Sequence, residues 1–235
     1  MVVGFQITNY NIAKLQNPMR SLDEYLLEAE HAHGHLCAGQ VLGVRLAMLG
    51  LEKLGIEDPR GNKEDRKRLV TFAEIDRCAT DAISLVTGCR LGKRALKFRD
   101  WGKMAATFID LASPLSSGVP LKPAFGLSGS ASDRRCNAIR IAAKESSKTL
   151  ARAMHPEIES KNQQQMLAYR EMPEDDLFTQ QWVKVELAAE ELPGYKGERI
   201  VCAECGEGIS FRREVVRDGR VLCRSCAGER YYEPL

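Results

Sequence analysis

Four cysteines near the C-terminus have the spacing of a metal site. Two intervening residues within each Cys-x-x-Cys pair let both thiolates turn toward one point, and seventeen residues separate the pairs. Tetrahedral coordination by four sulfurs suits zinc, with an iron site as the chief rival. Because four sulfurs leave no open position for water or substrate, we expect a structural zinc that stabilises this segment. The four ligands are Cys202, Cys205, Cys223 and Cys226.

A second group of possible ligands lies near the N-terminus. Three of the four histidines fall in HAHGHLC at 31–37, directly before an apolar stretch. Imidazole and thiolate are common ligands of zinc, nickel, copper and iron, and the glycine between two of the histidines lets the backbone turn. We therefore predict that His33, His35 and Cys37 converge, either on a metal or for acid–base work. In the alternative, His31 and His33 stay at the surface and only His35 and Cys37 pack inside.

A third group follows the next predicted strand. Cys78 is a candidate fourth ligand of the core metal or a nucleophile, Asp76 an orienting carboxylate, and Lys93 a holder of an anion. For Cys89 and Cys136 we favour core packing, because free cysteines are among the most buried residue types.

Helices must position the histidine and cysteine group. SLDE at 21–24 has the form of a capping box, so a helix is predicted to begin there. GQVLGVRLAMLGLEKL at 39–54 keeps a helical period but is apolar around most of its circumference, with one buried cation, Arg45. This pattern predicts a central helix. Gly39 and Gly43 lie one turn apart and leave a thin face against which another element can pack closely.

The middle of the chain is predicted to mix strands and helices. A strand at 69–73 leads into a helix that Asp76 or Thr80 caps and Gly88 ends. The fold class is therefore α+β. The further expected elements are strands at 95–99 and 103–111 joined as a hairpin at 100–102, a long loop at 113–132, helices at 133–154 and 161–170, and a strand at 178–187.

Chain length and the positions of proline and glycine predict two domains joined by a linker. With 235 residues it can bury a core that needs no metal. A segment with proline and glycine at 190–198 is typical of a linker. We expect a core domain at 1–189, this linker, and a small zinc-finger domain at 199–235.

Charge and hydropathy limit the kinds of partner that the protein is expected to bind. Lys and Arg number 34 against 32 Asp and Glu, so no overall field selects nucleic acid or an anionic membrane. Arginines of the cysteine segment are largely offset by nearby acids, so we favour a protein partner over nucleic acid. The first residues lack a secretory signal and no stretch has the length of a membrane span, so we expect a cytoplasmic protein with reduced cysteines.

Three motifs resemble a known family. HGHLCAGQVLGVRLA at 33–47, DRCATDAISLVTGCRLGK at 76–93 and FRDWGKMA at 98–105 are similar to the FmdE family, which takes its name from a component of formylmethanofuran dehydrogenase. The cysteine-rich tail resembles the treble-clef zinc finger that many members append. One departure stands at Ala38, where the family usually has proline.

The resemblance implies a fold and a pocket. An α+β core would pair into an intertwined homodimer, and a metal would bind near the His-Gly-His-x-Cys segment. The residues implied to line the site are His33, His35, Cys37, Asp76 and Cys78.

Three functions stay open. The first is a metal-binding protein accessory to a formylmethanofuran dehydrogenase of methanogenesis or one-carbon metabolism, with a core transition metal and a structural zinc. The second is an enzyme that uses Cys37 or Cys78 as a thiolate on a small anionic substrate, with His35 as base and Lys93 holding the anion. The third is a zinc-finger regulator or adaptor that binds nucleic acid or protein.

Overall fold

The computed structural model describes residues 20–113 and 138–233. The chain divides into two compact units, Met1–Val185 and Glu186–Leu235, whereas the finer limits expected at 189 and 199 stay predictions. No helix in the described part is long and apolar enough to cross a membrane.

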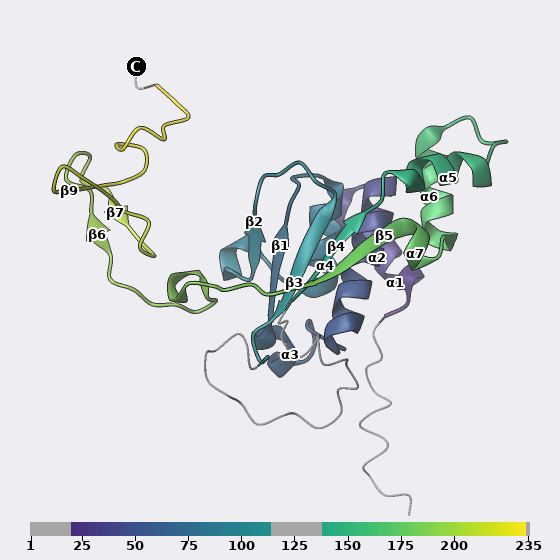
Figure 1. The fold of residues 1–235 in the computed structure, drawn as a ribbon, viewed down its shortest axis with the longest axis horizontal. Helices are drawn as coiled ribbons and strands as arrows, with labels where there is room; N and C mark the ends of the chain where they lie inside the picture. Colours follow the sequence, from purple (N-terminus) through teal and green to yellow (C-terminus); the bar gives the residue numbers. More distant parts are fainter. Residues whose placement is uncertain (1–19, 114–137, 234–235) are drawn as a thin grey trace, which may run out of the picture. The chain divides into compact units, whose positions relative to one another are not determined.

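The first unit combines helices with one sheet, which confirms the α+β class (Figure 1). Its helices are α1 (Leu22–His33), α2 (Ala38–Leu54), α3 (Lys63–Arg68), α4 (Cys78–Thr87), the short 3₁₀ helix η2 (Leu91–Lys93), α5 (Ser146–Met154), α6 (Lys161–Glu171) and α7 (Glu174–Leu177). Its strands are β1 (Leu69–Ala73), β2 (Leu96–Phe98), β3 (Ala105–Asp110), β4 (Ala138–Ala143) and β5 (Phe178–Val183).

The sheet order is β2-β1-β3-β4-β5, with β1 and β2 parallel and the other neighbours antiparallel. The hairpin predicted from 95–99 and 103–111 is therefore wrong. Both strands exist, but β1 lies between them, since Thr71 pairs with Leu96 on one side and Phe108 on the other. A buried strand such as β1 must satisfy the ladders on both of its edges, and this tertiary demand overrides the local turn.

The helix predicted at 133–154 is wrong in its first part. Residues 133–137 and most of the predicted loop lie outside the described residues, while β4 occupies 138–143 and only α5 is helical. The composition favours a helix, but Ile139 and Ile141 alternate into the core from a strand paired on both sides. Pairing with the neighbouring strands therefore outweighs the intrinsic helix propensity of this segment.

The predicted central helix is confirmed as α2, which packs on β3, β4 and α4. A Cβ atom built on Gly43 would lie 2.5 Å from the carbonyl oxygen of Ala79 and 2.8 Å from its Cα. One built on Gly50 would meet the ring of Phe108 at 2.3 Å. Glycine thus allows the backbone of α4 to lie directly against α2, as the thin face predicted.

The cation of α2 that was predicted to be buried, Arg45, is half-buried. Arg45 donates hydrogen bonds to the carbonyl oxygens of Tyr169, at 2.7 Å, and Met172, at 2.6 Å. These carbonyls lie at the C-terminal end of α6, where a positive charge is favoured. Arg45 therefore ties the central helix to α6.

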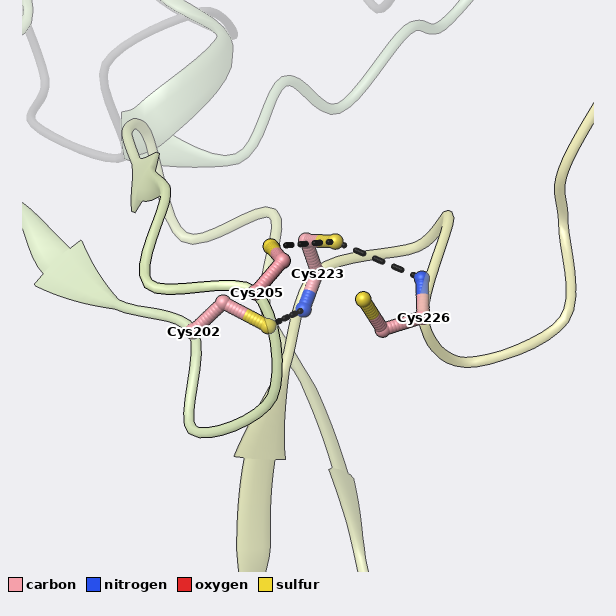
Figure 2. A group of neighbouring side chains, drawn as sticks. All are labelled: Cys202, Cys205, Cys223 and Cys226. Atoms are coloured by element: carbon pink, nitrogen blue, oxygen red, sulfur yellow. Dashed lines mark hydrogen bonds between the residues drawn. The ribbon is translucent and has the colours of Figure 1, made fainter. Parts of the chain in front are cut away.

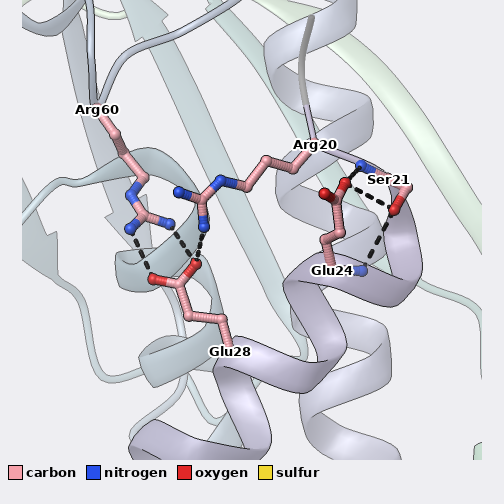
Figure 3. Close-up of polar contacts among 5 residues, drawn as sticks. All are labelled: Arg20, Ser21, Glu24, Glu28 and Arg60. Atoms are coloured by element: carbon pink, nitrogen blue, oxygen red, sulfur yellow. Dashed lines mark hydrogen bonds and ion pairs between the residues drawn. The ribbon is translucent and has the colours of Figure 1, made fainter. Parts of the chain in front are cut away.

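The start of α1 follows its sequence signal. Ser21 is the N-cap, its hydroxyl accepts from the backbone N–H of Glu24 at 3.3 Å, and the Glu24 carboxylate accepts from the Ser21 N–H at 2.8 Å (Figure 3). This reciprocal pair is the predicted capping box.

One acidic side chain holds the middle of α1. Glu28 receives two hydrogen bonds from Arg60, at 2.9 Å and 2.6 Å, and a further contact from Arg20 (Figure 3). Arg60 lies in the connection after α2, so the bidentate pair fixes α1 against that loop. Because α1 ends at His33, the contact that fixes α1 also helps to fix the position of the histidine cluster.

The second unit is small and built from two hairpins. Its elements are η4 (Ala189–Glu191), β6 (Ile200–Val201), β7 (Gly208–Ile209), β8 (Val215–Arg217) and β9 (Arg220–Leu222), with β6 paired to β7 and β8 to β9. Among residues described up to Glu233, no helix follows Cys226. The buried cluster consists of Cys202, Ile209, Leu222 and Ala227.

Candidate metal centres

The four cysteines of the second unit converge on one point. The turn after β6 carries the first pair, and the segment after β9 carries the second (Figure 2). Their sulfur atoms all lie within 4.8 Å of one another. The backbone N–H of Cys223 donates to the sulfur of Cys202 at 3.2 Å, and that of Cys226 donates to the sulfur of Cys223 at 3.3 Å. Such bonds stabilise thiolates in a zinc knuckle.

The pKa values of two of these thiols indicate a cluster in which a metal ion can replace the protons. Backbone N–H groups of Cys205 and Cys223 lower the pKa of the Cys202 thiol to about 6. Desolvation and the neighbouring thiols raise the pKa of Cys226 to about 12. Four thiolates this close repel one another, and a divalent cation removes that repulsion. Geometry and donor set therefore both fit a structural zinc.

The core group gathers at the junction of α1 and α2. His33 is the last residue of α1, Gly34 ends it in the left-handed region at φ 91°, and Cys37 is the N-cap of α2. Ligand atoms of His33, His35 and Cys37 lie within 4.8 Å of one another, and the two imidazole rings are 5.0 Å apart. The structure thus brings together the three residues singled out by spacing. His33 is half-buried and His35 exposed, which differs from the alternative arrangement at both residues, whereas His31 is exposed as that alternative expected.

An acidic residue that the motif spacing did not single out supports this group. Asp81 Oδ2 lies 3.0 Å from His33 Nδ1. With Nδ1 donating to the carboxylate, Nε2 is the nitrogen left for a metal, the usual carboxylate–histidine arrangement behind a metal ligand. Asp81 lies three residues after Cys78 in α4, and this i, i+3 spacing is the signal that would have found it.

Cys78 adjoins the group without entering it. A Cβ built on Gly39 would lie 3.4 Å from Cys78 Cβ and 3.7 Å from Cys37 Sγ, so both cysteines border the same spot. Burial, followed by the hydrogen bond and charge of Cys37, raises the pKa of the Cys78 thiol. The Cys78 thiol therefore holds its proton at neutral pH when no metal is bound, which disfavours a free thiolate nucleophile.

The cap predicted for α4 is wrong. Neither Asp76 nor Thr80 caps this helix. Its N-cap is Arg77, which makes no side-chain capping bond. The Thr80 hydroxyl instead donates to the carbonyl of Ile75, because Thr80 already lies within the first helical turn.

A cavity of about 480 Å³ opens beside the core group. This volume lies within the range of small-molecule sites. Asp76 and Cys78 line the cavity as expected, whereas Lys93 is exposed in η2 and outside the lining. Two other cations, Arg77 and Lys97, take that place. The complete lining is His33, Asp76, Arg77, Cys78, Thr80, Asp81, Leu91, Leu96, Lys97 and Phe98.

The residue after the motif cysteine is held from a distant helix. The backbone N–H of Ala38 donates to Asn162 Oδ1 of α6 at 3.2 Å. A proline at this position would have no N–H to satisfy. The side chain of Asn162 thus compensates for the departure from the family motif.

Comparison with known families identifies the chain. The family model described as "FmdE, Molybdenum formylmethanofuran dehydrogenase operon" matches residues 32–179, more than half of the chain. The chain belongs to the FmdE family. A second model, "Prokaryotic dksA/traR C4-type zinc finger", matches residues 195–232 and confirms a four-cysteine zinc finger after the FmdE core. The treble-clef form of that finger stays a prediction.

Two relatives extend the comparison. A protein of Archaeoglobus fulgidus called "Probable S-adenosyl-L-methionine-binding protein" is 30% identical over 92% of this chain, which spans 56% of that relative's length. A crystal structure from Syntrophus aciditrophicus, of an FmdE-like protein named after the tungsten formylmethanofuran dehydrogenase, has a TM-score of 0.56 and 19% identity, and covers 91% of this chain and 96% of its own. At that identity it supports the fold alone.

Proposed function

We propose that the FmdE core binds one transition metal through His33, His35 and Cys37. The convergence of these three ligand atoms carries the proposal. Three protein ligands leave a position open on a tetrahedral metal, which is the pattern of catalytic or exchangeable sites rather than structural ones. The lining of the neighbouring cavity includes His33, so a small molecule bound there would lie beside one of the three proposed ligands.

The residues present fit such a metal. One thiolate with two imidazoles suits zinc, nickel, copper or iron. Asp81 orients one imidazole, and Cys78 borders Cys37 outside the three-ligand cluster. When bound, the metal would supply Lewis acidity at its open position. Arg77 and Lys97 would favour an anionic group in the cavity, and Asp76 would orient it.

The wider role follows the family. We propose an accessory function beside a formylmethanofuran dehydrogenase or a related one-carbon enzyme, supported by the family name and by the open ligand set. Binding of S-adenosylmethionine, which the name of the Archaeoglobus relative suggests, is not carried over, because nearly half of that relative lies outside the matched region. A homodimer, implied by the family resemblance, is testable by light scattering of the purified protein.

The finger serves a different role in this proposal. Its exposed apolar side chains include Val201 at 63%, Val216 at 68% and Tyr231 at 96% exposure. Exposed aromatic and aliphatic groups suit a protein partner better than phosphate. Any nucleic-acid binding of the finger should therefore be non-specific, and charge reversal of Arg212 and Arg213 should not change it in a fluorescence anisotropy titration. Salt-sensitive binding that this charge reversal abolishes would favour nucleic acid as the partner instead.

Metal content tests the core proposal directly. Mass spectrometry of the untagged protein should find two metals per chain. His35→Ala with Cys37→Ala should reduce this to one, whereas His31→Ala, an exposed histidine outside the cluster, should keep two. One metal in the unaltered protein and in both variants would reject the core site and leave the finger zinc.

A further inference from the structure

A buried glutamine beside the histidine cluster has an unused acceptor. Gln40, the third residue of α2, is 1% exposed. Its Nε2 donates to the carbonyl of Ala29 in α1 at 3.0 Å, which fixes the orientation of the amide. Its Oε1 is buried and accepts no hydrogen bond from the described residues. A buried amide oxygen without a donor is costly, so a donor that is not part of the chain is expected there.

The same glutamine lines a small cavity behind His33. This cavity holds about 50 Å³ and is walled by Ala29, Ala32, His33, Gln40, Asp81, Ala82 and Leu85. It is large enough for an ordered water but too small for an organic ligand. Its polar walls belong to Gln40, His33 and Asp81.

The donors and acceptors around this cavity select its occupant. The Asp81 carboxylate accepts from His33 through Oδ2, which leaves Oδ1 with capacity to accept. Gln40 Oε1 is also an acceptor, so an occupant that bridges the two groups must donate in two directions. A water molecule has the required pair of hydrogens.

We propose that an ordered water bridges Gln40 Oε1 and the Asp81 carboxylate, and that Gln40 is thereby a positioning residue for the metal ligand His33. The functional part of this inference rests on the proposed core metal. The chain of contacts runs from the Ala29 carbonyl through Gln40, the water and Asp81 to His33 Nδ1.

Exposure explains why the carboxylate needs a second anchor. The side chain of Asp81 is 70% exposed, whereas that of His33 is 19% exposed. An exposed ionic contact restrains a side chain weakly, because water competes for it. A water held by the fixed amide of Gln40 restricts the carboxylate from the buried side, and so keeps Nε2 of His33 directed at the metal.

A crystal structure of the protein with zinc in the finger and no metal in the core, at a resolution that shows ordered waters, tests the bridge without a core metal. Density within hydrogen-bonding distance of both Gln40 Oε1 and an Asp81 oxygen is expected. A dry cavity, or a water that contacts only one of the two groups, would overturn the proposal.

Cobalt titration tests the positioning role. The finger is first loaded with one equivalent of zinc, and cobalt(II) is then titrated into the core of the full chain. Asp81→Ala should weaken core binding about tenfold or more, and Gln40→Leu by a smaller factor with an altered cobalt absorption spectrum. Because Gln40 acts through Asp81, the double variant should match Asp81→Ala alone. Effects that simply add would contradict the bridge.

A second buried glutamine provides the matched control. Gln164 is 8% exposed, and its Nε2 donates to the carbonyls of His155 and Ile158 in the α5–α6 connection. Gln164→Leu should reduce thermal stability as Gln40→Leu does but leave the cobalt spectrum unchanged. A spectrum altered equally in both variants would assign the Gln40 effect to general destabilisation and reject positioning. No core cobalt in the unaltered protein would reject the proposed metal site, while the crystal structure without a core metal would still decide the water bridge.

Discussion

The zinc finger and the proposed core metal site differ in what holds their ligands in place. In the finger, four cysteines converge around a buried cluster of only four residues, so little apolar surface supports them. In the core, His33 ends α1, Cys37 caps α2 and His35 lies between them, and the buried faces of both helices belong to the main hydrophobic core. A site without a supporting core depends on its metal to fold, whereas a site on packed helices is formed before the metal binds.

Metal removal should separate the two centres most strongly. Chelation should unfold the finger, because metal binding supplies on the order of 10 kcal/mol to small zinc domains. The core should keep its fold. Hydrogen exchange read by peptide would show lost protection across 200–227 and retained protection in α2. Protection that persists in the chelated finger would mean that its hairpins fold without metal.

Gly43→Ala should disturb the packing of the helices that hold the core site and leave the finger unchanged. The added methyl would meet the Ala79 backbone and the Ala82 side chain at 2.5–2.9 Å, so α2 and α4 must separate. We expect a loss of about 1–3 kcal/mol in the free energy of unfolding. Weaker core binding of cobalt should accompany it, since α4 carries Cys78 and Asp81.

Gly92→Ala is the control for that variant. A Cβ at Gly92 would meet nothing within 4 Å. Denaturant unfolding of both variants gives the comparison, and equal losses would show that the close approach of α2 and α4 is not the cause.

Glu28→Gln should give a smaller effect than Gly43→Ala, about 1 kcal/mol at neutral pH after screening is allowed for. The hydrogen bond from Arg60 lowers the pKa of Glu28 below its ordinary value of 4.5. The stabilisation is therefore complete above that value and is lost as pH falls through the lower folded-state pKa. Unfolding curves across this window should show the difference between the two proteins disappear in acid.

The exposed pair of Glu64 and Lys67 provides the comparison for Glu28. These side chains are 77% and 59% exposed and 3.1 Å apart. Glu64→Gln should change stability by no more than a few tenths of a kcal/mol. A loss as large as that of Glu28→Gln would argue that the anchor of α1 is no stronger than an ordinary surface pair.

Local patterns predicted the parts of the molecule that depend on near neighbours. The capping box at Ser21, the central helix with Arg45, and the thin face at Gly43 all follow from residue types within one or two turns. The hairpin expected at 95–111 and the helix expected at 133–154 failed because the position of a strand depends on its partners across the sheet. Neither turn chemistry nor composition records those partners.

The sequence by itself determined the ligand types of the zinc finger and of the proposed core site, because Cys-x-x-Cys pairs and the His-Gly-His-x-Cys segment bring ligands together over short stretches of chain. It also predicted the α+β class. Only the tertiary structure decided what stands behind those ligands. Asp81 meets His33 across 48 positions, and Asn162 meets Ala38 across 124. Lys97 takes the place in the cavity lining that was expected for Lys93. Such contacts arise from the packing of α1, α2, α4 and α6, and packing depends on how whole surfaces fit together rather than on the spacing of residues along the chain.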